Sequence, residues 1–137
     1  GGLWRPPSRC MAAPPRVLCL HGRSQTGAIF EERLSRLRRS AAGLDCVFVD
    51  GPIQVVSEHG DALRGWRRGG DGAASEWDAA EEVLRRAWLE LGPFDGVLGF
   101  SEGAQAAHLF CELHCRPAAG RAPTLFGLRF AILAGGV

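Results

Sequence analysis

The sequence predicts an α/β fold in which helices cover both faces of a parallel sheet. Short apolar runs, typical of strands that are buried on both faces, recur along the chain. Amphipathic segments with apolar residues at helical spacing separate these runs. The resulting order of four strands alternating with three helices is that of parallel strands joined by right-handed crossovers.

The first half of the chain supplies two strands and one helix. RVLCLH, residues 16–21, is a nearly continuous apolar run and predicts the first strand. AIFEERLSRLRRSA, residues 28–41, places its apolar residues on one side and its charges on the other, which predicts a helix. DCVFVD, residues 45–50, predicts the second strand, and the Gly-Pro pair after it ends that strand.

A long connection and a second helix follow. Residues 51–76 are rich in glycine and charge, contain Trp66 in LRGWRRGG, and predict an irregular stretch. A connection of that length in a compact domain is usually functional or mobile. EWDAAEEVLRRAWLEL, residues 76–91, has an apolar side at helical spacing and predicts the second helix, which a second Gly-Pro pair terminates.

The last part of the chain completes the alternating pattern. FDGVLGF, residues 94–100, predicts the third strand, and SEGAQAAHLFCELHC, residues 101–115, predicts the third helix. After a loop with Pro and Gly, LRFAILAGG, residues 128–136, predicts the fourth strand. No internal repeat is visible, so a single domain is expected.

Length and composition set the class of protein. The chain has 137 residues, 46% of them hydrophobic, and a formal charge of +1 with its arginines scattered among acids. This composition predicts one globular domain over residues 16–137, after an N-terminal extension, residues 1–15, that we expect to be disordered. It gives no reason to expect a nucleic-acid partner or an anionic membrane. No run approaches the roughly 18 apolar residues of a membrane span, and we expect a cytoplasmic protein, with the nucleus as the alternative.

Cysteine spacing argues against a disulfide framework and against a metal site. The five cysteines form an odd set without CxxC spacing, and we interpret them as reduced thiols: Cys10, Cys19, Cys46, Cys111 and Cys115. Two of them lie near His108 and His114, but helical spacing puts these side chains on two stripes rather than around one ion. We therefore expect neither a metal nor a cofactor.

Ser101 lies at the centre of a G-x-S-x-G pattern, GFSEG, between the third predicted strand and the third predicted helix. In this pattern the chain turns so sharply that side chains at Gly99 and Gly103 would clash with neighbouring elements, and the serine hydroxyl projects from the edge of the sheet. The backbone N–H of Glu102 then points from a helix start toward a developing oxyanion. The alternative is a serine that only caps the helix, but the strand before it and the helix after it favour a nucleophile.

The loop LHGRSQTG after the first strand is the expected source of a second oxyanion donor. The backbone N–H of Arg23, with Ser24 as its neighbour, lies at the position from which such a loop donates. The loop also has the G-x-x-x-x-G spacing of a phosphate-binding loop, but Ala28 and Ile29 stand where that motif needs Lys and Ser or Thr. We interpret His21 as a structural residue at the strand end rather than as a base.

A family resemblance follows from several motifs in their order along the chain. RVLCLHG, VFVDGP, RGW, LGPFDGVLGFSEGA and ILAGG resemble the serine-hydrolase family called FSH, also described as LovG-like, over residues 16–136. The resemblance implies an α/β-hydrolase fold and hydrolysis of carboxylic esters through an acyl-enzyme. It implies that Ser101 is the nucleophile, that Glu102 and Arg23 supply the oxyanion-hole N–H groups, and that Trp66 lies in a lid-like segment over the substrate pocket.

The chain departs from the family pattern at three positions. The family usually has Gln where this chain has Glu102, so a side-chain charge is expected near the oxyanion. An aromatic residue is common where this chain has Arg23. Another aromatic tends to follow Trp66 where this chain has Arg67, which predicts a more polar or differently closed acyl pocket.

The acid and the histidine of a Ser-His-Asp triad are missing after Ser101. In α/β-hydrolases they follow the serine along the chain, but the residues after Ser101 contain no Asp, and both histidines lie on the helix that Ser101 opens. His108 is about 10 Å along that helix, beyond hydrogen-bond reach. We therefore expect the N-terminal portion of a carboxylesterase-type serine hydrolase, a partial α/β-hydrolase fold without its C-terminal strands, which is inactive as given. Its expected substrate is a small ester, for which the insert with Trp66 suggests an apolar acyl group; the alternative is a non-catalytic binding domain or a nonfunctional fragment.

Overall fold

The computed structural model describes residues 13–40, 43–69, 74–114 and 127–135. Most of the predicted N-terminal extension, residues 1–15, lies outside these ranges, as do Cys10 and Cys115.

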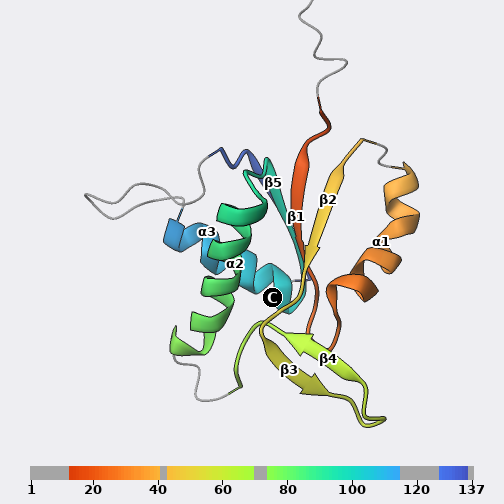
Figure 1. The fold of residues 1–137 in the computed structure, drawn as a ribbon, viewed down its shortest axis with the longest axis vertical. Helices are drawn as coiled ribbons and strands as arrows, with labels where there is room; N and C mark the ends of the chain where they lie inside the picture. The colour runs from red at the N-terminus through yellow and green to blue at the C-terminus, as the bar shows by residue number, and fades with distance from the viewer. Residues whose placement is uncertain (1–12, 41–42, 70–73, 115–126, 136–137) are drawn as a thin grey trace, which may run out of the picture.

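Four parallel strands form the central sheet, in the order β2-β1-β5-β6 (Figure 1). Their bounds are β1 Arg16–Leu20, β2 Asp45–Val49, β5 Gly96–Phe100 and β6 Phe130–Ala134. In the register of β1 with its two neighbours, Leu18 pairs with Val47 on one side and with Val97 on the other. The four strands predicted from apolar runs are confirmed, each within a few residues of its predicted ends.

Helices cover both faces of this sheet, as predicted. Their bounds are α1 Gly27–Ser40, α2 Asp78–Leu91 and α3 Glu102–His114. Figure 1 shows α1 on one side of the strands and α2 and α3 on the other. Because successive side chains of a strand point to opposite faces, Leu18 and Leu20 pack in the core with α2 and α3, whereas Val17 and Cys19 pack with Phe30 of α1.

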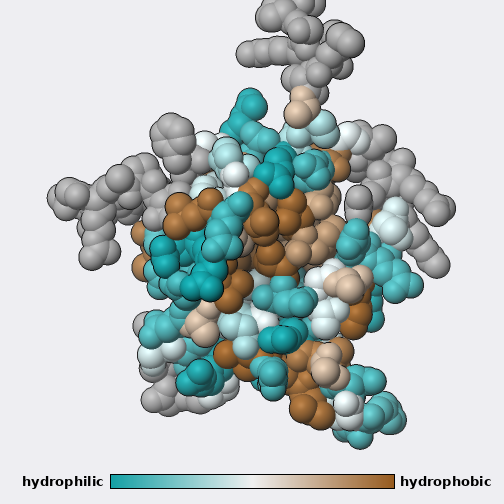
Figure 2. All heavy atoms as spheres, in the orientation of Figure 1, coloured by the Kyte–Doolittle hydropathy of each residue, from teal (hydrophilic) through white to brown (hydrophobic). Residues whose placement is uncertain are grey.

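The sidedness of α2 follows from its sequence. Ala80, Leu84, Ala87 and Trp88 recur at the spacing of one helix face, and all four are buried. Figure 2 shows hydrophilic residues over the outward side of this helix and apolar residues between it and the strands. Within the described ranges, no helix is both long and apolar enough to cross a lipid bilayer.

The stretch 51–76 is not irregular throughout, so this prediction was wrong. An antiparallel hairpin, β3 Ile53–Val56 and β4 Ala62–Gly65, lies in its first half, and a 3₁₀ turn, Ala74–Trp77, precedes α2. Each strand has only four residues, and most of their side chains are not fully buried. The pattern of apolar residues alone therefore does not predict them. The hairpin lies beyond the carboxyl ends of the parallel strands, which is the end of the sheet where Ser101 is found (Figure 1).

Backbone hydrogen bonds tie this hairpin to the loop after β1. Ser24 N–H donates to the carbonyl oxygen of Arg64 at 2.9 Å, and Arg64 N–H donates to the carbonyl oxygen of Gln25 at 2.7 Å. The loop that carries Arg23 is therefore fixed by β4 as well as by its own strand.

Strand β6 lies at the edge of the sheet. Among the described residues it pairs only with β5, and Ile132 and Leu133 remain 48% and 44% exposed. The open side of this strand has the character of an unpaired sheet edge.

Candidate active site

Ser101 occupies a strained turn between β5 and α3. Its φ is 56°, in the left-handed region that residues other than glycine rarely adopt. Its N–H donates to the carbonyl oxygen of Ala134 on β6 at 2.7 Å, and its own carbonyl oxygen accepts from the N–H groups of Ala104 and Gln105 at 2.9 and 3.2 Å. Such a conformation costs about 1–3 kcal/mol and persists only where the surroundings enforce it, as these hydrogen bonds do.

The two glycines of the motif are required by close approaches of the backbone. A Cβ atom on Gly99 would lie 2.5 Å from the carbonyl oxygen of Gly103, and one on Gly103 would lie 2.3 Å from that of Leu20. These distances are shorter than any ordinary contact, so only glycine lets α3 start this close to β1 and β5. The steric reason for the G-x-S-x-G spacing is thus present in this chain.

Ser101 is half-buried, and no hydrogen bond joins its hydroxyl to any residue within the described ranges. Both histidines of α3 lie away from it. His108 is exposed, and the Nε2 of His114 is 3.0 Å from Oε1 of Glu81 on α2.

The backbone N–H groups of Arg23 and Glu102, the expected oxyanion donors, differ from that of Ser24 in whether they already make a hydrogen bond. The N–H of Ser24 is already bound to Arg64 of β4. The N–H groups of Arg23 and Glu102 make no hydrogen bond to a residue that the structure describes. An oxyanion needs N–H donors that are not already hydrogen-bonded. This geometry therefore favours the N–H of Arg23 over that of Ser24 as the second oxyanion donor.

His21 is a buried structural residue. Its Nδ1 donates to the carbonyl oxygen of Gly22 at 2.7 Å, and its Nε2 accepts from the N–H of Gly51 at 2.9 Å. Burial removes the ring from water and lowers the pKa of His21 below its usual value, which keeps the imidazole neutral. Both ring nitrogens are occupied by the backbone, so the ring joins the end of β1 to the start of the hairpin segment.

Trp66 is also a core residue, with 0% of its surface exposed. Its Nε1 donates to the carbonyl oxygen of His21 at 2.8 Å, and the two rings lie 5.2 Å apart. This position does not support the expectation that Trp66 lines a substrate pocket. The indole instead lies between β4 and the end of β1. Its burial there is tolerated because its one polar atom, Nε1, has a hydrogen-bond acceptor.

The three positions at which the sequence departs from the family pattern lie in one hydrogen-bond network. Oε1 of Glu102 accepts from the N–H groups of Trp66 and Arg67 at 2.6 and 3.0 Å. Nη1 of Arg23 lies 3.2 Å from Oε2 of Glu102 and donates to the carbonyl oxygen of Arg67 at 3.1 Å. The carboxylate is therefore turned into the hairpin and paired with a cation, rather than left as a bare charge beside the oxyanion.

The loop from Gly22 to Gly27 does not present a phosphate site. The N–H of Gly27, at the start of α1, donates to Oδ1 of Asp50 at 2.7 Å. A carboxylate thus already occupies the helix N-terminus where a phosphate would bind and would repel it. The described cysteines, Cys19, Cys46 and Cys111, carry reduced thiols.

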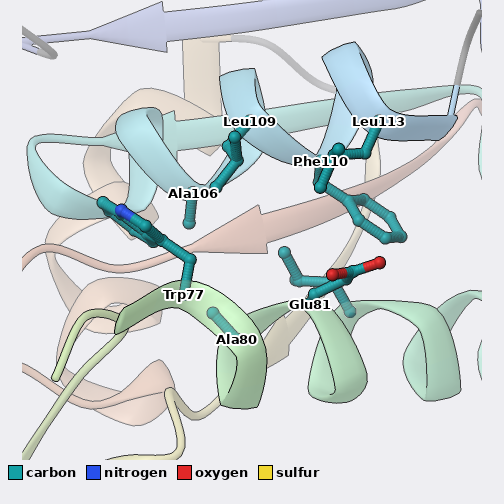
Figure 3. A pocket seen from close by; sticks show the side chains of 8 residues that line it. Trp77, Ala80, Glu81, Ala106, Leu109, Phe110 and Leu113 are labelled. Atoms are coloured by element: carbon teal, nitrogen blue, oxygen red, sulfur yellow. The ribbon is translucent and has the colours of Figure 1, made fainter. Parts of the chain in front are cut away.

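Two hollows are formed by the described residues, and the turn around Ser101, residues 99–103, which we call the elbow, contributes Phe100 to one of them. One, between α2 and α3, has a volume of about 10 Å³ and is walled by mostly apolar side chains including Trp77, Leu109 and Phe110 (Figure 3). It is no larger than one water molecule. The other is an apolar groove of about 430 Å³, lined by residues of α1, β5, β6 and the loop after β1: Gln25, Phe30, Arg33, Leu34, Leu98, Phe100, Ile132 and Ala134. Ser101 lines neither hollow.

Sequence reasoning missed the contacts that join Glu102 and Arg23 to the hairpin. The elbow was detectable because its residues are consecutive. The network joins residues far apart in the chain and depends on a hairpin that was not predicted. The alternation in IQVV, followed by the turn residues SEHGD, was the available signal for it.

Known proteins resemble this chain over most of its length. The model of the family described as Serine hydrolase (FSH1) matches residues 11–137. Esterase OVCA2 of Danio rerio is 31% identical over 91% of this chain and 66% of its own length, and Esterase C25G4.2 of Caenorhabditis elegans is 34% identical over 88% of this chain and 59% of its own length. The chain thus spans about two thirds or less of the length of these curated relatives.

A solved structure shows the same fold at lower identity. Arabidopsis thaliana SOBER1 superimposes with a TM-score of 0.52 at 16% identity, over 70% of this chain and 53% of that protein. The partial α/β-hydrolase fold is therefore confirmed, with a parallel sheet, helices on both faces and a serine at the strand-to-helix turn. Together with the match of the family model over almost the whole chain, these features show that the chain belongs to the FSH1 serine hydrolase family.

Proposed function

We propose that this protein hydrolyses carboxylic esters through an acyl-enzyme, with Ser101 as the nucleophile. The observation that carries the proposal is the strained, positive φ of Ser101 between two glycines that admit no side chain. A serine that only capped α3 would not need this conformation, because caps adopt ordinary extended angles.

The steps of the reaction use groups at this end of the sheet. Oγ of Ser101 attacks the ester carbonyl carbon, its proton passes to a base, and the carbonyl oxygen becomes an oxyanion. The N–H groups of Glu102 and Arg23 stabilise that oxyanion. Collapse of the intermediate breaks the bond to the alkoxy group, which leaves as an alcohol after taking a proton, and water then attacks the acyl-enzyme to release the acid.

Among the described residues, no side chain is hydrogen-bonded to the Ser101 hydroxyl as a base would be, and His59 and His108 are exposed. His21 is committed to Gly22 and Gly51, and His114 to Glu81. We therefore propose that the 137-residue chain alone hydrolyses esters several orders of magnitude more slowly than a protein with a complete triad, because oxyanion stabilisation and binding account for only part of the rate.

A fluorophosphonate probe tests the assignment of Ser101. The proposal predicts covalent labelling, mapped to Ser101 by mass spectrometry, that Ser101→Ala abolishes and the exposed-site control Ser35→Ala leaves intact. Labelling of a longer natural form but not of the 137-residue chain would assign the defect to the missing base. Absence of labelling in both forms would contradict the proposal and favour a non-catalytic binding domain.

A further inference from the structure

The buried carboxylate of Glu102 lies at the junction of three segments that are distant in the sequence. It is carried by the first residue of α3, and it accepts from the backbone at the end of β4. The side chain of Arg23 reaches it from the loop after β1. These are the elbow, the hairpin and the loop that carries the second expected oxyanion donor.

Both oxygens of this carboxylate have partners, and the side chain is shielded from water. The Glu102 side chain is 8% exposed, whereas that of Arg23 is 44% exposed. One carboxylate oxygen has two backbone N–H donors and the other has the guanidinium. Charged hydrogen bonds of this kind are stronger than neutral ones, and removal of one partner leaves a buried charge without full compensation.

The fold leaves space for this arrangement at Gly65. A Cβ atom at that position would lie 3.0 Å from Oε1 of Glu102 and 3.2 Å from Nη1 of Arg23. The last residue of β4 is therefore glycine at the point where the carboxylate and the guanidinium meet the strand.

We propose that the Glu102 side chain, paired with Arg23, is a positioning residue that fixes the two oxyanion-hole segments relative to each other. Glu102 supplies one oxyanion donor with its own N–H, and through its carboxylate it holds the residue that supplies the other. This inference rests on the proposed function, since it concerns the same site. It assigns the ion pair a role in the acylation step and not only in stability.

Four variants separate charge, hydrogen bonding and coupling. Glu102→Ala removes the acceptor, Glu102→Gln keeps an oxygen acceptor without the charge, Arg23→Met keeps the stem without the cation, and the double variant Arg23→Met/Glu102→Gln removes both charges. Glu82→Ala is the matched control, because Glu82 is an exposed glutamate that pairs with Arg85 on α2.

The kinetic readout is inactivation of Ser101 by a fluorophosphonate, resolved into the rate at saturation and the probe concentration at half-saturation. We expect Glu102→Ala to lower the saturated rate about 10- to 100-fold at an unchanged half-saturation concentration, since a displaced oxyanion donor weakens the transition state and not the ground state. Glu102→Gln should stay within about fivefold of the parent. Arg23→Met should lose about tenfold, and the double variant should lose no more than Arg23→Met alone, because two groups in direct contact are not additive.

Amide hydrogen exchange is a second readout that needs no activity. In Glu102→Ala the N–H groups of Trp66 and Arg67 should exchange about tenfold faster or more, and in Glu102→Gln they should stay protected. If the parent chain does not label at all, the proposed function is decided by labelling of the longer natural form, and exchange alone decides the positioning role. Unchanged exchange in Glu102→Ala overturns it.

Two further outcomes are decisive. A variant that melts at lower temperature but keeps both kinetic constants shows that the network serves stability alone, and the proposal is wrong. If Glu102→Ala does not fold, the comparison of Arg23→Met with the double variant decides: a loss in the double variant no greater than in Arg23→Met supports the coupling, and a loss equal to the product of the two single losses refutes it.

Discussion

The indole N–H of Trp66 donates to the backbone carbonyl oxygen of His21 at 2.8 Å, in a region with no exposure to water. The side chain of His21 in turn accepts from the N–H of Gly51. These two contacts join the end of the central strand β1 to both ends of the hairpin segment. The end of the sheet that holds Ser101 thus rests on two buried rings, each hydrogen-bonded to the backbone of a neighbouring segment.

Replacement of Trp66 by Phe should destabilise the protein. The His21 carbonyl oxygen would lose its donor in a buried site, which costs about 1–3 kcal/mol, and the smaller ring would add a void. Urea unfolding measured against Trp77→Phe, at a half-buried tryptophan, provides the comparison. A loss at Trp66 no larger than that at Trp77 would contradict the assigned role.

The stability of the fold should fall as the pH drops below about 6.5. His21 has a lowered pKa in the folded state, chiefly because burial desolvates it, so between that pKa and 6.5 the unfolded chain binds more protons. The stabilisation is complete above 6.5 and is lost on acidification, by up to about 1.4 kcal/mol per pH unit for one proton. Unfolding free energies of the parent and of His21→Gln from pH 5 to 8 isolate this term, with the exposed His108→Gln as control. Equal pH slopes for parent and His21→Gln would show that another group is responsible.

Glycine at position 101 should make the chain more stable while removing the nucleophile. The φ of 56° is unfavourable for Ser and for Ala but not for Gly, so Ser101→Gly should be more stable than Ser101→Ala by about 1 kcal/mol. Thermal unfolding of both variants beside the parent measures the difference. If the two variants melt together, the strain assigned to the elbow is absent.

Alanine at position 103 should severely destabilise the fold. Its Cβ would lie 2.3 Å from the carbonyl oxygen of Leu20, which is backbone and can move only if α3 shifts from β1. We expect a loss above about 3 kcal/mol, as for the largest overpacking effects. Gly69→Ala is the matched control, since no atom of the described residues lies within 4 Å of its Cβ position and its φ is outside the left-handed region. Chemical denaturation of the two variants should differ sharply, and similar midpoints would refute the steric reading of the motif.

Local patterns sufficed for the central sheet, the three helices and the elbow. Each of these depends on consecutive residues: apolar runs in β1 and β5, helical spacing in α2, and the two glycines around Ser101. The hairpin of β3 and β4 was not predicted, because short, half-exposed strands bury too few apolar side chains to leave a pattern in the sequence. The burial of Trp66 and the pairing of Arg23 with Glu102 depend on where that hairpin folds back, which no local pattern encodes.

The hydrogen bond from Ser101 N–H to the carbonyl oxygen of Ala134 can form during synthesis only once β6 has been made. The acceptor belongs to the last strand that the structure describes, so a nascent chain that has exposed β5 and α3 but not β6 lacks one of the contacts that hold the strained turn. The turn at Ser101 therefore gains this contact late in translation, when β6 has left the ribosome and docked beside β5.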